Sequence, residues 1–120
     1  MNIESVAVFC GSHLGNNPVY GEHVKELGKL LCMLKIKIVY GGGHKGLMGV
    51  LADSVLEQDG QIMGIIPQLL IEAEQQHKGL SEIAVVPDMH TRKKMMYERS
   101  DAVIVLPGGF GTLDELFEIL

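Results

Sequence analysis

The stretch from Ala102 to Glu115 changes from an apolar run to a glycine-rich loop and then to a helical pattern. Residues 102–106 are continuously apolar and mostly β-branched, which is typical of a parallel strand covered on both faces. Pro107 ends that run, and the three glycines among the next four residues allow a sharp turn and a close approach by another group. The stretch therefore predicts a strand and a glycine loop that leads into a helix.

The helix that follows this loop is predicted from Thr112, a suitable N-cap, and from apolar residues at helical spacing (Leu113, Leu116, Phe117 and Leu120). Free N–H groups and the positive end of a helix dipole form a ready site for an anion, most commonly phosphate. Glu115 has two interpretations, because T-x-x-E is also a capping box in which the glutamate only bonds back to the Thr112 N–H. The number of glycines favours a ligand site in addition to a cap.

The rest of the chain alternates short apolar runs with helical patterns. Strands are predicted at 6–10, 36–39, 62–66 and 83–86. Helices are predicted at 19–34, from the end of the 41–49 glycine loop to about 57, and at 89–100. Asn17 is the expected cap of the first helix, with Pro18 at the first helical position, and Asp88 is the expected cap of the last. This order predicts an α/β, Rossmann-like, doubly wound parallel sheet in three layers, formed by residues 1–120 as one domain. Its glycine loops would then meet at the carboxyl ends of the strands.

Two further segments bear on a site at that edge. Residues 67–78 are predicted to form a short helix and a mobile loop, in which Glu74 would be a solvated charge. Arg92, Lys93 and Lys94 lie at the unfavourable end of a helix dipole unless an anion is near. The spacing of Arg92 from Met89 and Met96 places it at the edge of the apolar stripe, facing inward, although a solvated basic face is the alternative.

Several functions are disfavoured by the residues. Gly41, Gly43 and Gly46 satisfy G-x-G-x-x-G, but the next predicted strand ends in Pro67-Gln68 without the carboxylate that a dinucleotide needs. The sequence contains no Walker A loop, and its histidines lack the spacing of common metal sites. We therefore expect no metal and no cofactor.

Composition limits the partners and the compartment. The formal charge of −5 argues against a nucleic-acid surface. Cys10 and Cys32 show no C-x-x-C spacing, which is typical of thiols in a reducing compartment. Glu4 interrupts any secretory signal, and no apolar run reaches transmembrane length. We expect a cytoplasmic protein without a membrane partner.

Two motifs together resemble one family. Residues 107–115 match PGGxGTxxE and residues 89–93 match M-H-x-R-K of the LOG (LONELY GUY) proteins, while Cys10-Gly11-Ser12 and the 40–49 loop are similar to that family's other loops. LOG proteins are cytokinin riboside 5′-monophosphate phosphoribohydrolases that are often labelled lysine decarboxylases. Nothing in this sequence supplies a recognisable pyridoxal-phosphate lysine with its partners.

The resemblance implies hydrolysis of the N-glycosidic bond of a nucleoside 5′-monophosphate by a homodimer. It implies that Arg92 and Glu115 are the catalytic pair. Substrate contacts are implied for Gly11, Ser12, Gly42, Gly43, Glu74, Lys93, Gly108, Gly109, Phe110, Gly111 and Thr112. Such a carboxylate would stabilise an oxocarbenium-like sugar and orient water, while the arginine balances charge.

Two alternatives stay open. Molybdenum-cofactor carriers resemble this fold and share the P-G-G-x-G-T loop, so a non-catalytic carrier of a nucleotide or of that cofactor is one. A nucleosidase that acts on AMP or other purine nucleotides is the second. The chain also ends at Leu120 inside a predicted helix, and family members continue further, so we expect the C-terminal part of the domain to be truncated.

Overall fold

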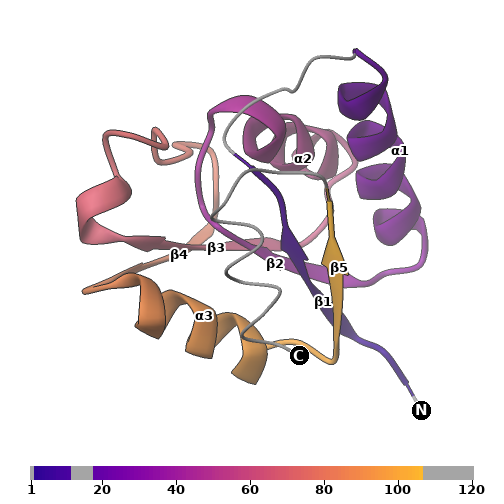
Figure 1. Cartoon of the computed structure of the whole chain (residues 1–120). Helices are drawn as coiled ribbons and strands as arrows, with labels where there is room; N and C mark the ends of the chain where they lie inside the picture. Colours follow the sequence, from indigo (N-terminus) through magenta and orange to yellow (C-terminus); the bar gives the residue numbers. More distant parts are fainter. Residues whose placement is uncertain (1, 12–17, 107–120) are drawn as a thin grey trace.

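The computed structural model describes residues 2–11 and 18–106. Within them, a parallel sheet has the strand order β4-β3-β2-β1-β5. The strands are β1 (Ser5–Phe9), β2 (Lys37–Tyr40), β3 (Ile62–Pro67), β4 (Glu82–Val86) and β5 (Ala102–Val105). The helices are α1 (Val19–Met33), α2 (Gly46–Glu57) and α3 (Met89–Glu98), with a short 3-10 turn, η1 (Gln68–Leu70). The predicted three-layer α/β fold is confirmed (Figure 1).

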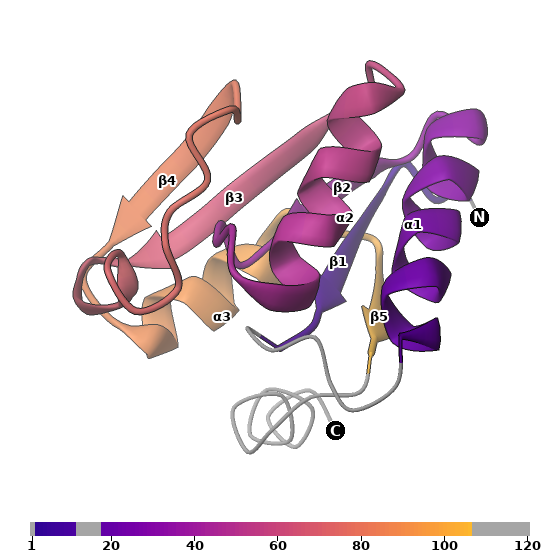
Figure 2. The same cartoon turned by 90° about the horizontal axis from the view of Figure 1, so that it is seen from above.

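Helices cover both faces of the sheet, with α1 and α2 on one side and α3 on the other (Figure 2). Alternate residues of the strands therefore enter two separate cores. Val6, Val8, Ile38 and Tyr40 belong to the core under α1 and α2, whereas neighbours of these residues such as Ala7, Phe9 and Val39 belong to the core under α3. Strands that are apolar at every position are what this double covering requires.

The direction in which successive strands are added to the sheet reverses at β1, and this reversal determines where the candidate site lies. β2 lies on one side of β1 and β5 on the other, so the connections after β1 and β5 leave from neighbouring strands. In open α/β sheets a ligand binds at the carboxyl ends of the strands beside this kind of switch point. The two predicted loops that begin near residues 11 and 107 start there, although most of both loops lies outside the described residues.

Three details differ from the sequence-based expectations. Residues 102–105 were expected to be covered on both faces, but they are only half-buried or exposed, because β5 is the last strand of the described sheet. α1 begins at Val19, as predicted, but its N-cap is Pro18, which was expected at the first helical position, and Asn17 lies outside the described residues. The helix expected within 67–78 is only the single turn η1, followed by turns.

Candidate functional site

Arg92 is a buried charged side chain that several hydrogen bonds hold in place. It is 3% exposed although it carries a full positive charge. Its Nε donates to the Ile65 carbonyl at 2.9 Å, and its Nη2 donates to the Gly41 carbonyl and to Glu74 Oε1, the latter at 2.7 Å. These acceptors come from β3, from the loop after β2 and from the segment after η1, so the guanidinium joins one strand and two loop segments. The prediction that Arg92 faces inward is confirmed.

Glu74 supplies the anion that Arg92 requires. Its side chain is 17% exposed, and its two oxygens lie 2.7 Å from Nη2 and 3.5 Å from Nη1 of Arg92. The expectation that Glu74 is a solvated charge is therefore wrong. A buried arginine is tolerated only when paired and hydrogen-bonded. No local pattern in the sequence indicates that Glu74, eighteen residues earlier, is its partner.

The glycine loop after β2 is built to let these groups approach. A Cβ on Gly41 would lie 2.2 Å from Arg92 Nη2, and a Cβ on Gly43 would lie 2.8 Å from the Glu74 carbonyl oxygen. Gly42 has a φ of +80°, which favours glycine, and its Cα lies where a Cβ of Gly64 would come within 2.7 Å. The glycines of this loop thus allow close packing against Arg92, Glu74 and β3.

Tyr40, the last residue of β2, holds this loop through its side chain, a role that the sequence analysis missed. Its ring is fully buried and its hydroxyl donates to the Gly43 carbonyl at 2.9 Å. Burial raises the pKa of the Tyr40 hydroxyl, because the charged phenolate would be desolvated. The group therefore stays a proton donor to the loop. An apolar strand residue with one polar tip beside a glycine run is the only signal that could have indicated it.

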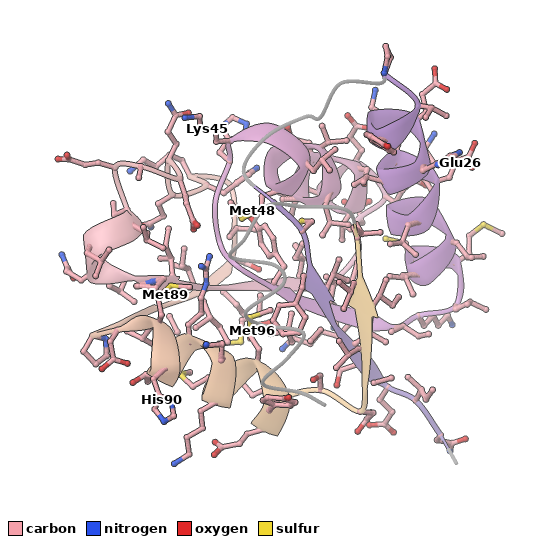
Figure 3. The ribbon with its side chains drawn as sticks, viewed as in Figure 1. Glu26, Lys45, Met48, Met89, His90 and Met96 are labelled. Carbon is pink, nitrogen blue, oxygen red and sulfur yellow. The ribbon has the colours of Figure 1, made fainter. Side chains whose placement is uncertain are left out.

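The start of α3 is fixed by Asp88, as predicted. The Asp88 carboxylate accepts from the Thr91 N–H and from the Thr91 hydroxyl, both at 2.7 Å. These bonds hold the pKa of Asp88 below its usual value, with the hydroxyl bond as the larger cause. The cap sets the first turn of the helix that carries Arg92 and the buried Lys93. In Figure 3, Met96 of this helix points toward the sheet and His90 points away from it.

The structure brings together part of the predicted site. Gly42 and Gly43 are buried beside Glu74 and Arg92, and Lys93 is buried on the same helix as Arg92. Gly11 is half-buried at the start of the connection after β1. The remaining predicted residues, Ser12, Gly108, Gly109, Phe110, Gly111, Thr112 and Glu115, lie outside the described residues.

A cluster of two histidines and an aspartate, which the sequence spacing did not predict, lies between the loop after β2, α2 and the segment after η1. The side chains of His44, Asp53 and His77 place one ligand-type atom each within 4.8 Å of one another. His77 Nε2 lies 2.7 Å from Asp53 Oδ1, and His44 Nε2 lies 3.6 Å from Asp53 Oδ2. Members so far apart in the chain form no recognisable motif, and only the fold brings them together.

A separate cleft of about 310 Å³ opens at the opposite edge of the sheet, where β2 and β3 begin. Its lining residues are Cys32, Lys35, Ile36, Gln58, Asp59, Gly60 and Gln61. Burial raises the pKa of the Cys32 thiol, so this group is not an activated nucleophile. Cys10 and Cys32 are both half-buried and are not joined by a disulfide, as expected. The cleft contains none of the predicted site residues.

Comparison with known proteins assigns the chain to a family. Residues 48–120 match the family described as "Possible lysine decarboxylase". The chain belongs to this family. It is 45% identical over 118 residues to the cytokinin riboside 5′-monophosphate phosphoribohydrolase of Rhodococcoides fascians, covering 98% of this chain and 60% of that protein. A protein of the same name from Arabidopsis thaliana is 44% identical over 124 residues, covering 100% of this chain and 58% of that protein.

These matches confirm the resemblance to the LOG family. They also show that the chain spans about 60% of the length of the curated relatives that it matches.

Solved structures with less sequence similarity share the fold. The molybdenum cofactor binding protein of Rippkaea orientalis is 22% identical with a TM-score of 0.78, covering 98% of this chain and 70% of that one. The Moco carrier protein of Chlamydomonas reinhardtii is 18% identical with a TM-score of 0.76, over the same shares. At these identities the likeness concerns the fold alone.

Within residues 2–11 and 18–106, no helix is long and apolar enough to cross a membrane.

Proposed function

We propose that the protein hydrolyses the N-glycosidic bond of a nucleoside 5′-monophosphate of the cytokinin riboside class. Water adds to the anomeric carbon of the ribose, the bond from that carbon to the base nitrogen breaks, and the base leaves with a proton. The products are the free base and ribose 5-phosphate. The named activity of the two relatives supports this reaction, and the observation that carries it in this chain is the buried pair of Arg92 and Glu74.

The contacts of Arg92 indicate which of its atoms meets substrate. Its Nε–H and both Nη2 protons have close oxygen acceptors, whereas among residues 2–11 and 18–106 the contacts of Nη1 are Glu74 Oε2 at 3.5 Å and the Met89 sulfur at 3.7 Å. Contacts of that length are weak. A substrate hydroxyl or phosphate oxygen that reached Nη1 would replace poor partners and not good ones. We therefore assign Nη1 to the substrate and the other nitrogens to positioning.

The pairing also defines what Arg92 contributes electrostatically. Glu74 balances its charge, so the pair is close to neutral as a unit before substrate binds. A fixed, water-poor guanidinium can stabilise negative charge that develops on the leaving base without a cost of reorganisation. We propose that Glu115 stabilises the oxocarbenium-like sugar and orients the attacking water, that residues 108–112 hold the phosphate, and that Lys93 assists them. Gly11, Ser12, Gly42 and Gly43 would complete the substrate contacts.

We also propose that the active form is a cytoplasmic homodimer that binds neither nucleic acid nor membrane. The negative formal charge supports the absence of a nucleic-acid surface. Met96 of α3 is 1% exposed and belongs to the core under that helix. A dimer contact would therefore use other residues of that helix. Light scattering of the purified protein measures the assembly directly.

The test is base release from AMP and from isopentenyladenosine monophosphate, followed by chromatography. We expect release by the wild-type protein, loss of turnover in Glu115→Gln, and an unchanged melting temperature, because glutamine still suits a capping box. Retained turnover in Glu115→Gln would contradict the assigned role of Glu115. The ratio of the two rates separates a cytokinin-directed enzyme from a general AMP nucleosidase. Nucleotide binding without any release would favour the carrier function.

A further inference from the structure

The segment that carries Glu74 is hydrogen-bonded to the loop after β2 at Glu74 itself and again three residues later. The Glu74 carbonyl accepts from the N–H groups of His44 and Lys45, at 3.1 and 3.2 Å. Three residues later, the His77 N–H donates to the Gly42 carbonyl at 3.0 Å. Because the sequence predicts a mobile loop here, the fastening needs a cause beyond local propensity. The side chain of His77 supplies one.

The hydrogen bonds of the His77 ring determine which nitrogen carries the proton. The Gly79 N–H points at Nδ1 over 2.9 Å. A backbone N–H is always a donor, so Nδ1 is the acceptor and the proton of the neutral ring is on Nε2. That Nε2–H then donates to Asp53 Oδ1 at 2.7 Å, and the ring is only 7% exposed. Both nitrogens are thus used, one within the segment and one across to α2.

This arrangement also argues against a metal ion at His44, Asp53 and His77, despite their proximity. A metal on His77 Nε2 would displace its proton to Nδ1, where it would oppose the Gly79 N–H. A metal-bound histidine normally donates its other N–H to an acceptor. The same geometry is fully satisfied when Asp53 simply accepts from His77.

We propose that Asp53 and His77 are positioning residues that hold residues 74–79 against the glycine loop and so keep Glu74 on Arg92. The Gly79 bond lies inside the segment and cannot fasten it to anything, whereas the Asp53 bond connects the segment to α2. α2 is itself fixed, since Leu51, Ala52 and Val55 are fully buried. The role in turnover rests on the proposed function, because it acts through Arg92.

Replacements at His77 separate its two hydrogen bonds. His77→Gln places an amide N–H near the position of Nε2 and keeps the bond to Asp53, whereas His77→Asn keeps an acceptor near Nδ1 and loses that bond. We expect kcat to fall about tenfold to a hundredfold in Asp53→Ala and in His77→Asn, with a smaller change in KM. His77→Gln should stay within about threefold of wild type. Glu57→Ala, an exposed carboxylate on the same helix, is the matched control and should behave as wild type.

Two further measurements show whether the effect passes through Glu74. In a Glu74→Gln background, Asp53→Ala should cause no additional loss, because its target is already removed. Amide hydrogen exchange at His44 and His77 should become faster in Asp53→Ala and stay unchanged in Glu57→Ala. Exchange needs no substrate, so it tests the fastening even if the wild-type protein shows no base release, which would count against the proposed function alone.

Several outcomes would overturn this proposal. One is activity that survives in His77→Asn and is lost in His77→Gln, and another is Asp53→Ala with wild-type exchange and turnover. The third outcome comes from adding Zn²⁺ alone to the metal-free protein and measuring its melting temperature. A rise in melting temperature that disappears in Asp53→Ala would show that the three side chains bind a metal and do not simply hold residues 74–79 in place.

Discussion

The two faces of the sheet bury different kinds of side chain. Under α1 and α2 the buried side chains are mostly apolar. The polar groups among the described residues there are the hydroxyls of Tyr40 and Ser54, which donate to the Gly43 and Leu51 carbonyls, and the His77 ring beside Asp53. Under α3 the core is smaller, and the helix that covers it buries Arg92 and Lys93 beside Met96. α1 and α2 therefore stabilise the fold mainly by burying apolar side chains. α3 buries fewer apolar side chains and places the charged Arg92 at the site instead. The comparison indicates that α3 is shaped by the site and the other face by the fold.

The largest effect is expected from breaking the charge pair on the α3 side. Arg92→Met should abolish base release and lower the free energy of unfolding by about 3–5 kcal/mol, because the half-buried Glu74 carboxylate loses its partner. Denaturant unfolding and the nucleotide assay measure the two effects.

A double replacement separates function from stability at the same place. Arg92→Met combined with Glu74→Leu should recover most of the stability, since a buried pair can be exchanged for apolar side chains at little cost. Activity should stay absent. If the double variant were as unstable as Arg92→Met, the pair would not be the cause of the loss, and the contrast between the two faces would weaken.

The opposite face should respond in the opposite way. Leu51 is fully buried in α2, and Leu51→Ala should lower the free energy of unfolding by about 2–5 kcal/mol through lost contacts and a cavity. The folded fraction should keep its KM for nucleotide, because Leu51 packs in the core under α1 and α2 and its side chain can make no hydrogen bond to a site group. A changed KM under strongly native conditions would show that this face also positions the site.

Sequence reasoning succeeded where the cause is local. The apolar runs, the Asp88 cap and the inward direction of Arg92 follow from neighbouring residues, and the structure contains them at nearly the predicted positions. It failed where the cause is tertiary. Three contacts arise only when the chain folds: Arg92 with Glu74, Tyr40 with the loop after β2, and Asp53 with His77. The residues that flank these groups in the sequence do not show which of them will meet. Glu115 and residues 108–112 stay predictions.

The Asp88 cap makes a pH-dependent contribution to the α3 side. Its pKa is lowered in the folded protein, so its stabilisation is fully present above the unfolded value of about 3.9 and is lost as pH falls through the folded value. Asp88→Ala should lower the melting temperature at neutral pH, and the difference from wild type should shrink in acid. Asp88→Asn, which still caps, should lose less at neutral pH. A difference that persists unchanged in strong acid would contradict a carboxylate cap.

The smallest effects are expected from two glycines of α1 that differ only in their surroundings. A Cβ on Gly21 would meet nothing within 4 Å, so Gly21→Ala should stabilise the protein by about 0.5–1 kcal/mol through helix propensity. A Cβ on Gly28 would lie 2.2 Å from the Ser54 hydroxyl oxygen, where α1 packs on α2. Gly28→Ala should therefore destabilise, by about 1–3 kcal/mol less the propensity gain. Thermal unfolding of both variants measures how closely the hydrocarbon face is packed, and equal stabilisation by both would mean that the contact between α1 and α2 yields easily.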